Sequence, residues 1–424
     1  MANPPRTDPR PLGPPPQSLL TARIHLGKVF KVDSSNFYLL LGITIFLLII
    51  GLLEVLSASS VGSFLANGQF FGAFMRQATF ALIGVPLMML VSQFPPSFWH
   101  RWATVILIAG SVAQLLVFTP LGYVAGGNRN WIIIAGLTAQ PSEFLKLAMA
   151  IWLGVTLPAS IRRNGPRNWR VLVAASPALV PIALVLAGGD LGTSIIMGLI
   201  VIAALFFSGV SLRIMLIPVV AAFVAFGGLA ATNSNRMARI FSFLGNDCID
   251  YTNACWQPLH GKWALAGGGI FGVGLGNSKA KWSWLPAADN DYIFAIIGEE
   301  LGIIGAVVVL LLFVLMAVAF VRIIKESPDP MIKITTGAIM FWIVGEAFVN
   351  ISVVVGVLPV LGVPLPLLSS GGTALTATLL AIGVVLSFTR STAQSSPNAP
   401  ASQRLKLSSG RPPASAPRST RSSR

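Results

Sequence analysis

Charge is scarce in this chain of 424 residues. Charged residues make up 10% of it, whereas a soluble domain carries roughly 25%. Several stretches of about 18 residues or more are almost free of charge, which is enough to cross a ~30 Å hydrocarbon core. The mean hydropathy is +0.77. This composition excludes a soluble globular protein and indicates a polytopic membrane protein.

Cysteine is equally scarce, with Cys248 and Cys255 alone in the chain. Two cysteines exclude a disulfide-rich scaffold. A metal site built on them would need further ligands, and the surrounding loop offers only His260. Because a disulfide is permitted outside the membrane, we expect the two to form a structural bond there.

Hydropathy predicts an all-α membrane protein with about ten transmembrane helices and one long extracytoplasmic loop, 232–290. No cleavable signal peptide is evident. Residues 1–36 hold seven prolines and residues 391–424 are rich in Ser, Pro and Arg, so both are predicted to be disordered tails around a membrane domain over 37–390. The expected spans are 37–57, 70–92, 102–119, 143–159, 171–188, 191–208, 214–231, 291–321, 334–358 and 372–390.

Lys and Arg in the loops predict the orientation. Segment 158–170 holds four arginines and segment 322–333 holds three basic residues, and both fall on one side if the spans alternate. The positive-inside rule places them, and both termini, in the cytoplasm. The net charge of +15 therefore fits basic tails that rest on anionic lipid better than nucleic-acid binding, so no nucleic-acid partner is expected.

Carboxylates beside or within a span are functional candidates by default. Asp291 begins the eighth span at its extracytoplasmic end, two residues after Asp289. Capping of the helix N-terminus is the alternative role for one of them. Glu299 and Glu300 lie two to three turns deeper, where bonding to neighbouring helices is the alternative to a functional role.

Other polar residues gather at span ends. Glu143 and Lys146, three apart, can pair on one helix face. Arg236 and Arg239 share a face just outside the seventh span, and they suit either a diphosphate or lipid headgroups. The Gly-rich stretch 264–278 is interpreted as close backbone packing or a re-entrant turn rather than a dinucleotide site. Further candidates are Arg129, Trp131, Gln140, Ser142, Asp190, Asn350, Ser369 and Ser370.

These motifs, in this order, resemble the SEDS family (shape, elongation, division and sporulation proteins). They are "NRNWI", "QPSEFLKLA", "DLGTS", "NRMARI", "GGGIFGVGLGNSKAKW", "LPAADNDYIFAIIGEELG" and "LPVLGVPLPLLSSGG". The resemblance covers about residues 40–390 and is greater to the division branch than to the elongation branch. It implies a peptidoglycan glycosyltransferase in the bacterial plasma membrane, at the division septum, that polymerises lipid II on the extracytoplasmic side.

The resemblance also implies roles for residues. Asp291 would be the catalytic base. Arg236, Arg239, Lys262, Lys279 and Lys281 would be candidates for the substrate diphosphate, with a divalent cation (Mg or Mn) as a further possibility and no organic cofactor. The chain departs from many relatives at Ala287, where they have Glu, at Glu346, where they have Gln, and at Ser370, where they have Tyr.

The resemblance implies partners as well: a class B penicillin-binding transpeptidase with a single span, and other divisome membrane proteins. Two other functions remain open from the sequence. A lipid II flippase would share the substrate without needing a base, and a non-catalytic divisome scaffold would leave Asp291 replaceable.

Overall fold

The computed structural model describes residues 34–125, 128–134, 137–231, 234–245 and 255–395. They belong to one compact unit that begins at Ser34. Within these ranges nine helical segments are long and apolar enough to span a membrane, and α7 is a shorter apolar helix of 17 residues. These ten segments fall on the ten predicted spans, so the prediction of an all-α polytopic protein is confirmed.

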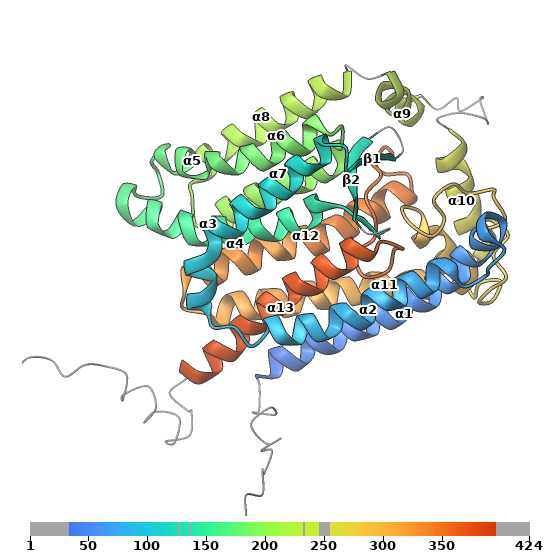
Figure 1. Cartoon of the computed structure of the whole chain (residues 1–424), viewed down its shortest axis with the longest axis horizontal. Helices are drawn as coiled ribbons and strands as arrows, with labels where there is room; N and C mark the ends of the chain where they lie inside the picture. Colours follow the sequence, from blue (N-terminus) through green and yellow to red (C-terminus); the bar gives the residue numbers. More distant parts are fainter. Residues whose placement is uncertain (1–33, 126–127, 135–136, 232–233, 246–254, 396–424) are drawn as a thin grey trace, which may run out of the picture. The chain divides into compact units, whose positions relative to one another are not determined.

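The helices that carry these segments run back and forth along one direction (Figure 1). α5 and α6 are joined by the 3₁₀ turn η3 (Ser176–Ala178) and act as one span. The bounds are α1 (Ser35–Asn67), α2 (Gly72–Val91), α3 (Pro96–Leu115), α4 (Pro141–Asn164), α5 (Arg170–Ala175), α6 (Leu179–Ala187), α7 (Leu191–Phe207), α8 (Leu212–Ala231), α11 (Ile293–Glu326), α12 (Pro330–Val354) and α13 (Gly372–Ser395).

The centre of the bundle is built from α4, α12 and α13. In each of these helices, two thirds or more of the most apolar 18-residue stretch is buried inside the protein, whereas in α8 the buried share is 6%. α8 therefore faces outward along most of its length, whereas the side chains of the three central helices pack in the core. Trp342 on α12 and Leu145 on α4 are among the fully buried side chains there.

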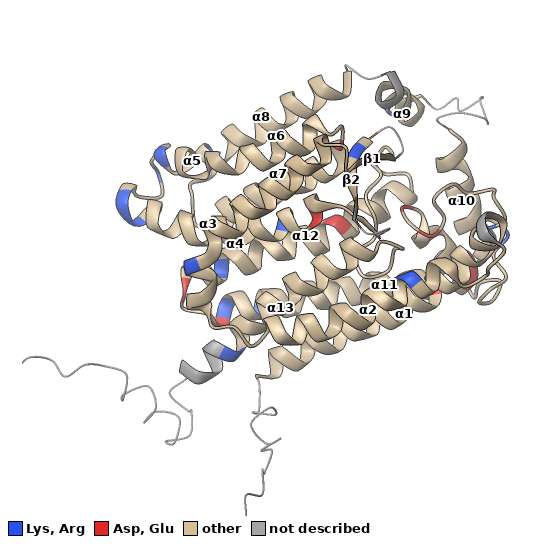
Figure 2. Cartoon of the chain, in the orientation of Figure 1, with Lys and Arg blue, Asp and Glu red and all other residues tan. Residues whose placement is uncertain are grey.

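Many of the basic residues gather at one end of the bundle. Figure 2 shows Lys and Arg where α4 turns into α5 and near the end of α13, at the left of the view. We call this the basic end. The loops that precede α4, α7 and α11 lie at the opposite end, to the right of Figure 1, and they carry most of the candidate residues.

Two regions between the predicted spans contain secondary structure that was not predicted from the sequence. A three-stranded antiparallel sheet, in the order β1 (Gly122–Ala125), β2 (Asn128–Ile134) and β3 (Leu137–Ala139), follows the 3₁₀ turn η2 (Leu116–Phe118). The isoleucine run of β2 suits a strand, and Ile132 is paired with Gly122 on one side and Ala139 on the other. The long loop contains two helices, α9 (Ser234–Leu244) and α10 (Trp256–Gly268).

α11 is broken at Gly302, whose φ of 69° is open to glycine and costly for other residues. The break frees backbone groups that the Gly-rich segment takes up. Val273 and Gly274 donate their N–H groups to the carbonyls of Glu299 and Glu300, both at 3.0 Å, and Ile303 donates to the carbonyl of Gly269 at 3.0 Å. The prediction of close backbone packing in this segment is confirmed.

Candidate functional site

Asp289, Asn290 and Asp291 form a short segment before α11 that we call the acidic strap. Each of its three carbonyl oxygens accepts a hydrogen bond from the chain around α12 and the loop before α13. The Ser370 amide donates to Asp289 at 2.8 Å. The Ser369 hydroxyl donates to Asn290, and the Asn350 amide donates to Asp291, both at 2.7 Å. The strap is therefore held along its whole length.

The loop that holds the strap is itself fixed to other helices. Gln77 on α2 donates to the carbonyl of Ser369 at 3.0 Å and accepts from the amide of Gly371 at 3.1 Å. Asn350 also donates to Val363 at 2.7 Å. Each of these two buried side-chain amides forms hydrogen bonds to two backbone groups. Such bonds limit the movement of the strap and of the loop before α13. Asn350, Ser369 and Ser370, all candidates from the sequence, thus lie beside Asp291 and position it through the backbone.

The Asp291 side chain does not cap helix α11. Capping was one alternative from the sequence, but Tyr292 is the N-cap of α11 and no side-chain capping bond is made. The carboxylate lies against Gly362 instead, 3.6 Å from where a Cβ on that glycine would stand. It is half-buried at the bundle end. The N-capping interpretation is therefore wrong.

Electrostatics make Asp291 a stronger base than an ordinary aspartate. Burial raises the pKa of its carboxyl to about 6, the neighbouring charge of Arg239 lowers that pKa, and the charges of Asp190 and Asp289 raise it further. Burial also raises the pKa of Asp289, against the opposing effects of its own backbone, Arg76 and the Ser370 hydroxyl. A carboxyl with a pKa near 6 is ionised at neutral pH and holds a proton more firmly than one near 4.

A second acidic group stands close to the first. Asp190 caps α7 through Thr193, accepting from its amide at 2.9 Å and its hydroxyl at 2.7 Å. Gln140 donates to the same carboxylate at 3.2 Å. The turn before Asp190 is braced by β2, because the Arg129 amide donates to the carbonyl of Gly188 at 2.7 Å. Asp190 and Gln140 therefore belong to the neighbourhood of Asp291.

The sheet accounts for the remaining residues of the first motif. The Arg129 guanidinium donates to the carbonyl of Thr119 at 2.9 Å, which ties β2 to the turn after η2. Trp131 is half-buried and pairs with Tyr123 across the sheet. In the structure both residues shape the rim of the site.

The predicted phosphate-binding cations are placed very differently from one another. Arg239 is exposed on α9 and acts electrostatically on Asp291. The side chain of Arg236 lies outside the described residues. Lys262 is exposed on α10, and its side chain passes over Gly356 after α12. Lys279 is exposed, and its amide donates to Glu299 at 3.0 Å.

Lys281 does not suit a diphosphate. It is buried, and its Nζ donates to the carbonyl of Gly276 at 2.5 Å, to Ser57 at 3.2 Å and to Glu300 at 3.3 Å. An ammonium group has three donors, so all are occupied. Lys281 is structural, which corrects the prediction.

Glu299 and Glu300 also make structural contacts. The expected bond to a neighbouring helix is seen for Glu300, which accepts from Ser57 on α1 at 2.6 Å, whereas Glu299 bonds to residues 278–280. The Glu300 carboxylate accepts from the amides of Gly276 at 3.0 Å and Ser278 at 3.2 Å, besides Ser57 and Lys281. Glu299 accepts from Ser278 and from the amides of Lys279 and Ala280. The two carboxylates thus shape the segment that leads into the acidic strap.

A buried ionic triad lies deeper, between α4 and α12. Lys146 pairs with Glu143 at 3.0 Å, as the sequence predicted, and with Glu346 at 3.1 Å. Its ammonium also lies 4.8 Å from the ring centroid of Trp342. The side chains are at most 4% exposed, and the hydroxyl of Ser142 beside them is buried too. A single ammonium group thus pairs with two carboxylates inside the core.

The cysteine prediction falls partly outside the described residues. Cys255 is buried at the start of α10 and is disulfide-bonded. Cys248 lies outside the described residues. In the part of the chain that the structure describes, no three His, Cys, Asp or Glu side chains are grouped as ligands for a metal ion, so the divalent cation stays a prediction with no assigned ligands.

One cavity adjoins the acidic strap. It has a volume of about 470 Å³ and lies between α1, α2 and residues 281–289, with Asp289 in its wall. Arg76 on α2 also lines it. The sequence prediction missed this arginine, although it is the sole charge in residues 70–92 and intramembrane charges are functional candidates.

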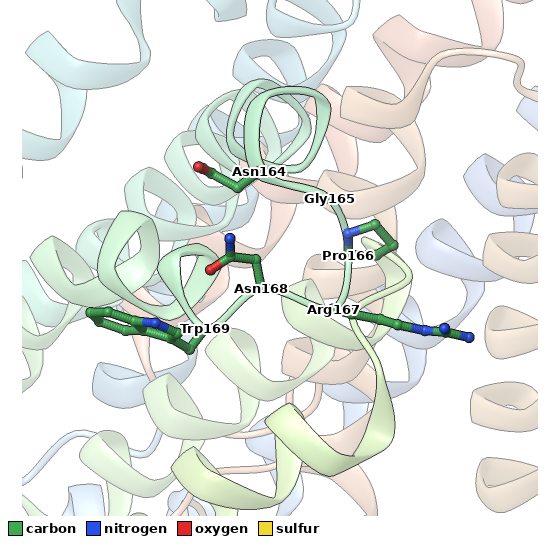
Figure 3. Close-up of a pocket in the computed structure, with 6 residues that line it drawn as sticks. All are labelled: Asn164, Gly165, Pro166, Arg167, Asn168 and Trp169. Carbon is green, nitrogen blue, oxygen red and sulfur yellow. The ribbon is translucent and has the colours of Figure 1, made fainter.

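A second hollow lies at the opposite, basic end. Its volume is about 720 Å³, and Figure 3 shows its lining from the turn between α4 and α5. This turn is on the far side of the bundle from Asp291, and it carries no acidic side chain. The hollow is therefore no part of the candidate site. It is lined by Asn164, Gly165, Pro166, Arg167, Asn168 and Trp169.

The fold and the site together define a class: a multi-pass helical membrane protein with a fixed acidic segment at one end of its bundle. Comparison with known proteins places it more closely. Residues 38–394 match the family model of FtsW, RodA and SpoVE, described as "Cell cycle protein". The chain belongs to this family.

Relatives in several bacteria are similar over most of their length. The "Probable peptidoglycan glycosyltransferase FtsW" of Mycobacterium tuberculosis is 38% identical over 370 residues, which is 87% of this chain and 70% of that protein. The "Stage V sporulation protein E" of Bacillus subtilis is 34% identical over 354 residues, which is 83% of this chain and 96% of that protein.

Solved structures share the fold. A chain of a peptidoglycan synthase complex, described as coordinating polymerization and crosslinking, matches with a TM-score of 0.70 at 22% identity, over 86% of this chain and 99% of that one. RodA of Thermus thermophilus matches with a TM-score of 0.62 at 23% identity, over 86% of this chain and 98% of that one. At these identities the likeness concerns the fold alone.

Proposed function

We propose that this protein is a peptidoglycan glycosyltransferase that polymerises lipid II, with Asp291 as its general base. The observation that carries the proposal is the acidic strap. Its three consecutive carbonyls are fixed, and the carboxylate of its last residue, Asp291, is half-buried with a pKa of about 6. The relatives named as FtsW peptidoglycan glycosyltransferases support the reaction.

The reaction needs a base for the attacking hydroxyl and a cation for the leaving diphosphate. The 4-hydroxyl of one lipid-linked disaccharide attacks C1 of another. The new O–C1 bond forms as the bond from C1 to the diphosphate breaks, and the configuration inverts. Asp291 takes the hydroxyl proton, which contributes typically 10²–10⁴-fold. The diphosphate leaves with its negative charge, which a positioned guanidinium stabilises.

Arg239 is our candidate for that second group. It is exposed at the same bundle end and its charge acts on Asp291, so a leaving diphosphate beside the strap lies within its field. Gln140 and Asp190 complete the neighbourhood. No step is assigned to a metal ion.

The cellular setting is also part of the proposal. The basic end would face the cytoplasm by the positive-inside rule, which puts the strap on the extracytoplasmic side. The resemblance of the sequence motifs to the SEDS family implies a class B transpeptidase as the partner. The family description, "Cell cycle protein", is consistent with action at the division septum, which the sequence resemblance implies.

The test is polymer synthesis by the purified complex with its cognate transpeptidase in a buffer with a divalent metal. Wild type, Asp291→Ala and a control, Asp329→Ala, would each receive lipid II, and glycan products would be resolved by gel. Asp329 is a matched aspartate that caps α12 at the basic end. Polymer from wild type and control but not from Asp291→Ala is expected.

Two outcomes would oppose the proposal. Polymer from Asp291→Ala would remove the base from Asp291. If an intact complex made no polymer in any version, a flippase or a scaffold would be favoured. The structure offers a flippase little support, because the deep charges of α4 and α12 are paired with each other in the closed core.

A further inference from the structure

The cavity beside the acidic strap has the size of a ligand-binding site. Its volume of about 470 Å³ lies within the ~300–1,000 Å³ of typical ligand pockets. Small residues on α1 and α2 form one wall, among them Gly62, where a Cβ would meet no atom within 4 Å. The other wall is the segment 281–289, which ends in the strap.

Arg76 is the cation available to a ligand in this cavity. It is exposed, and within the described part of the chain it makes no salt bridge, the three pairs found there involving other residues. Lys281 also lines the cavity, but its three donors are occupied, as described above. A guanidinium with free donors in a polar cavity suits a phosphate or diphosphate, which it binds bidentately.

The cavity wall is coupled to the strap by strained backbone. Ser283 and Ala287 both line the cavity and have φ of 68° and 53°, unusual for residues with a side chain. The carbonyl of Ala287 accepts from the amides of Asn290 and Tyr292, both at 3.1 Å. Such strain is typical of functional sites, and here the strained residues join the cavity wall to the residues around Asp291.

The two aspartates of the strap are influenced by different cations. The charge of Arg239 acts on Asp291, and the charge of Arg76 acts on Asp289. The proposed reaction uses two lipid diphosphates at once. The donor's diphosphate is attached to the reacting C1, so it must leave beside Asp291. The acceptor reacts through the hydroxyl of its second sugar, so its diphosphate lies one disaccharide away.

We propose that the cavity at Arg76 binds the diphosphate end of the acceptor lipid, while Arg239 serves the donor. This inference rests on the proposed function and assigns the two substrates to opposite sides of the strap. The cavity then sets the acceptor's position through Ala287 and the strap, because the bound diphosphate and the attacking hydroxyl belong to one molecule.

Two lipid II analogues separate the substrates. In the donor analogue the GlcNAc 4-hydroxyl is replaced by hydrogen, so it cannot accept. In the acceptor analogue the anomeric oxygen is replaced by methylene, so its diphosphate cannot leave. Together they give one lipid-linked tetrasaccharide, and KM can be measured for each with the other saturating. The variants are Arg76→Ala, Arg76→Lys and Gly62→Leu, with Arg101→Ala, an exposed arginine near the start of α3, as the control.

Loss of a charge-assisted contact predicts that Arg76→Ala raises the acceptor KM about tenfold or more. The donor KM and kcat stay unchanged, Arg76→Lys restores part of the loss, and Gly62→Leu raises the acceptor KM by filling the cavity. A rise in donor KM, a fall in kcat alone, or no effect would each overturn the assignment. No tetrasaccharide from wild type would instead refute the proposed function itself.

Discussion

The pH dependence of polymerisation should report the charges around Asp291. Because the base must be ionised, kcat/KM falls as pH drops through its pKa of about 6, and kcat/KM reflects groups of the free enzyme. An isolated aspartate would place this acid limb near pH 4. We expect about 90% of the plateau at pH 7 and about 10% at pH 5.

Removing the charge of Arg239 and removing the charge of Asp190 should shift the acid limb of the pH profile in opposite directions. Arg239 lowers the pKa of Asp291 and Asp190 raises it. Arg239→Gln therefore raises the pKa, on the order of one unit for a close opposite charge. At pH 6 this takes activity from about half of the plateau to about a tenth. Asp190→Asn lowers the pKa, and asparagine can still cap α7.

The assay is kcat/KM for lipid II from pH 4.5 to 8.5 in the complex with the transpeptidase, each variant normalised to its own plateau. Normalisation separates the position of the limb from any loss of phosphate binding at Arg239. Salt should shrink the shift, because Arg239 is exposed and exposed charges are screened. A limb near pH 4 in wild type, or shifts of the same sign in both variants, would refute the reasoning.

Three further predictions concern the scaffold. Gly302→Ala should lower the thermal unfolding temperature markedly, because its Cβ would strike the backbone of the Gly-rich segment at a positive φ, whereas Gly227→Ala, which meets nothing within 4 Å, should be tolerated. Lys146→Met should lower the free energy of unfolding by about 3–5 kcal/mol, because it leaves buried carboxylates unpaired. Glu346→Gln should lower it by much less, since Glu143 still pairs with the lysine. Equal unfolding shifts in the two variants would contradict this. Glu299→Gln should speed hydrogen exchange at the amides of residues 279 and 280, and unchanged protection there would show that the carboxylate does not hold the segment.

The arrangement of spans could be predicted because hydrocarbon thickness imposes it on the sequence. Long uncharged runs leave few alternatives, and even the short α7 was found. The sheet at β1–β3 was missed because its strands are short and lie in a loop between two predicted spans, for which no secondary structure was predicted. The isoleucines at 132–134 in "NWIII" were the available signal, since β-branched residues favour strands.

The site was predictable only in part. Asp291 stood out as a carboxylate at a span end, but the groups that fix its backbone come from far along the sequence. Asn350 lies 59 residues away and Ser369 lies 79 residues from Asn290, and no local pattern joins them. Lys281 was misassigned because a lysine near a site looks the same in sequence whether its donors are free or occupied. Arg76 was missed although it is the sole charge in residues 70–92, because the sequence does not show that it lines a cavity beside the strap.

The most direct test of the central claim is a comparison of kcat and KM for wild type and Asp291→Asn with lipid II at pH 7.5. Asparagine keeps the size of the side chain and the backbone contacts of the strap, so only the base is removed. The account predicts that kcat falls about 10²–10⁴-fold while KM and binding of the transpeptidase are unchanged. A kcat equal to that of wild type would contradict it, since the proton would then be leaving by a route that does not involve Asp291.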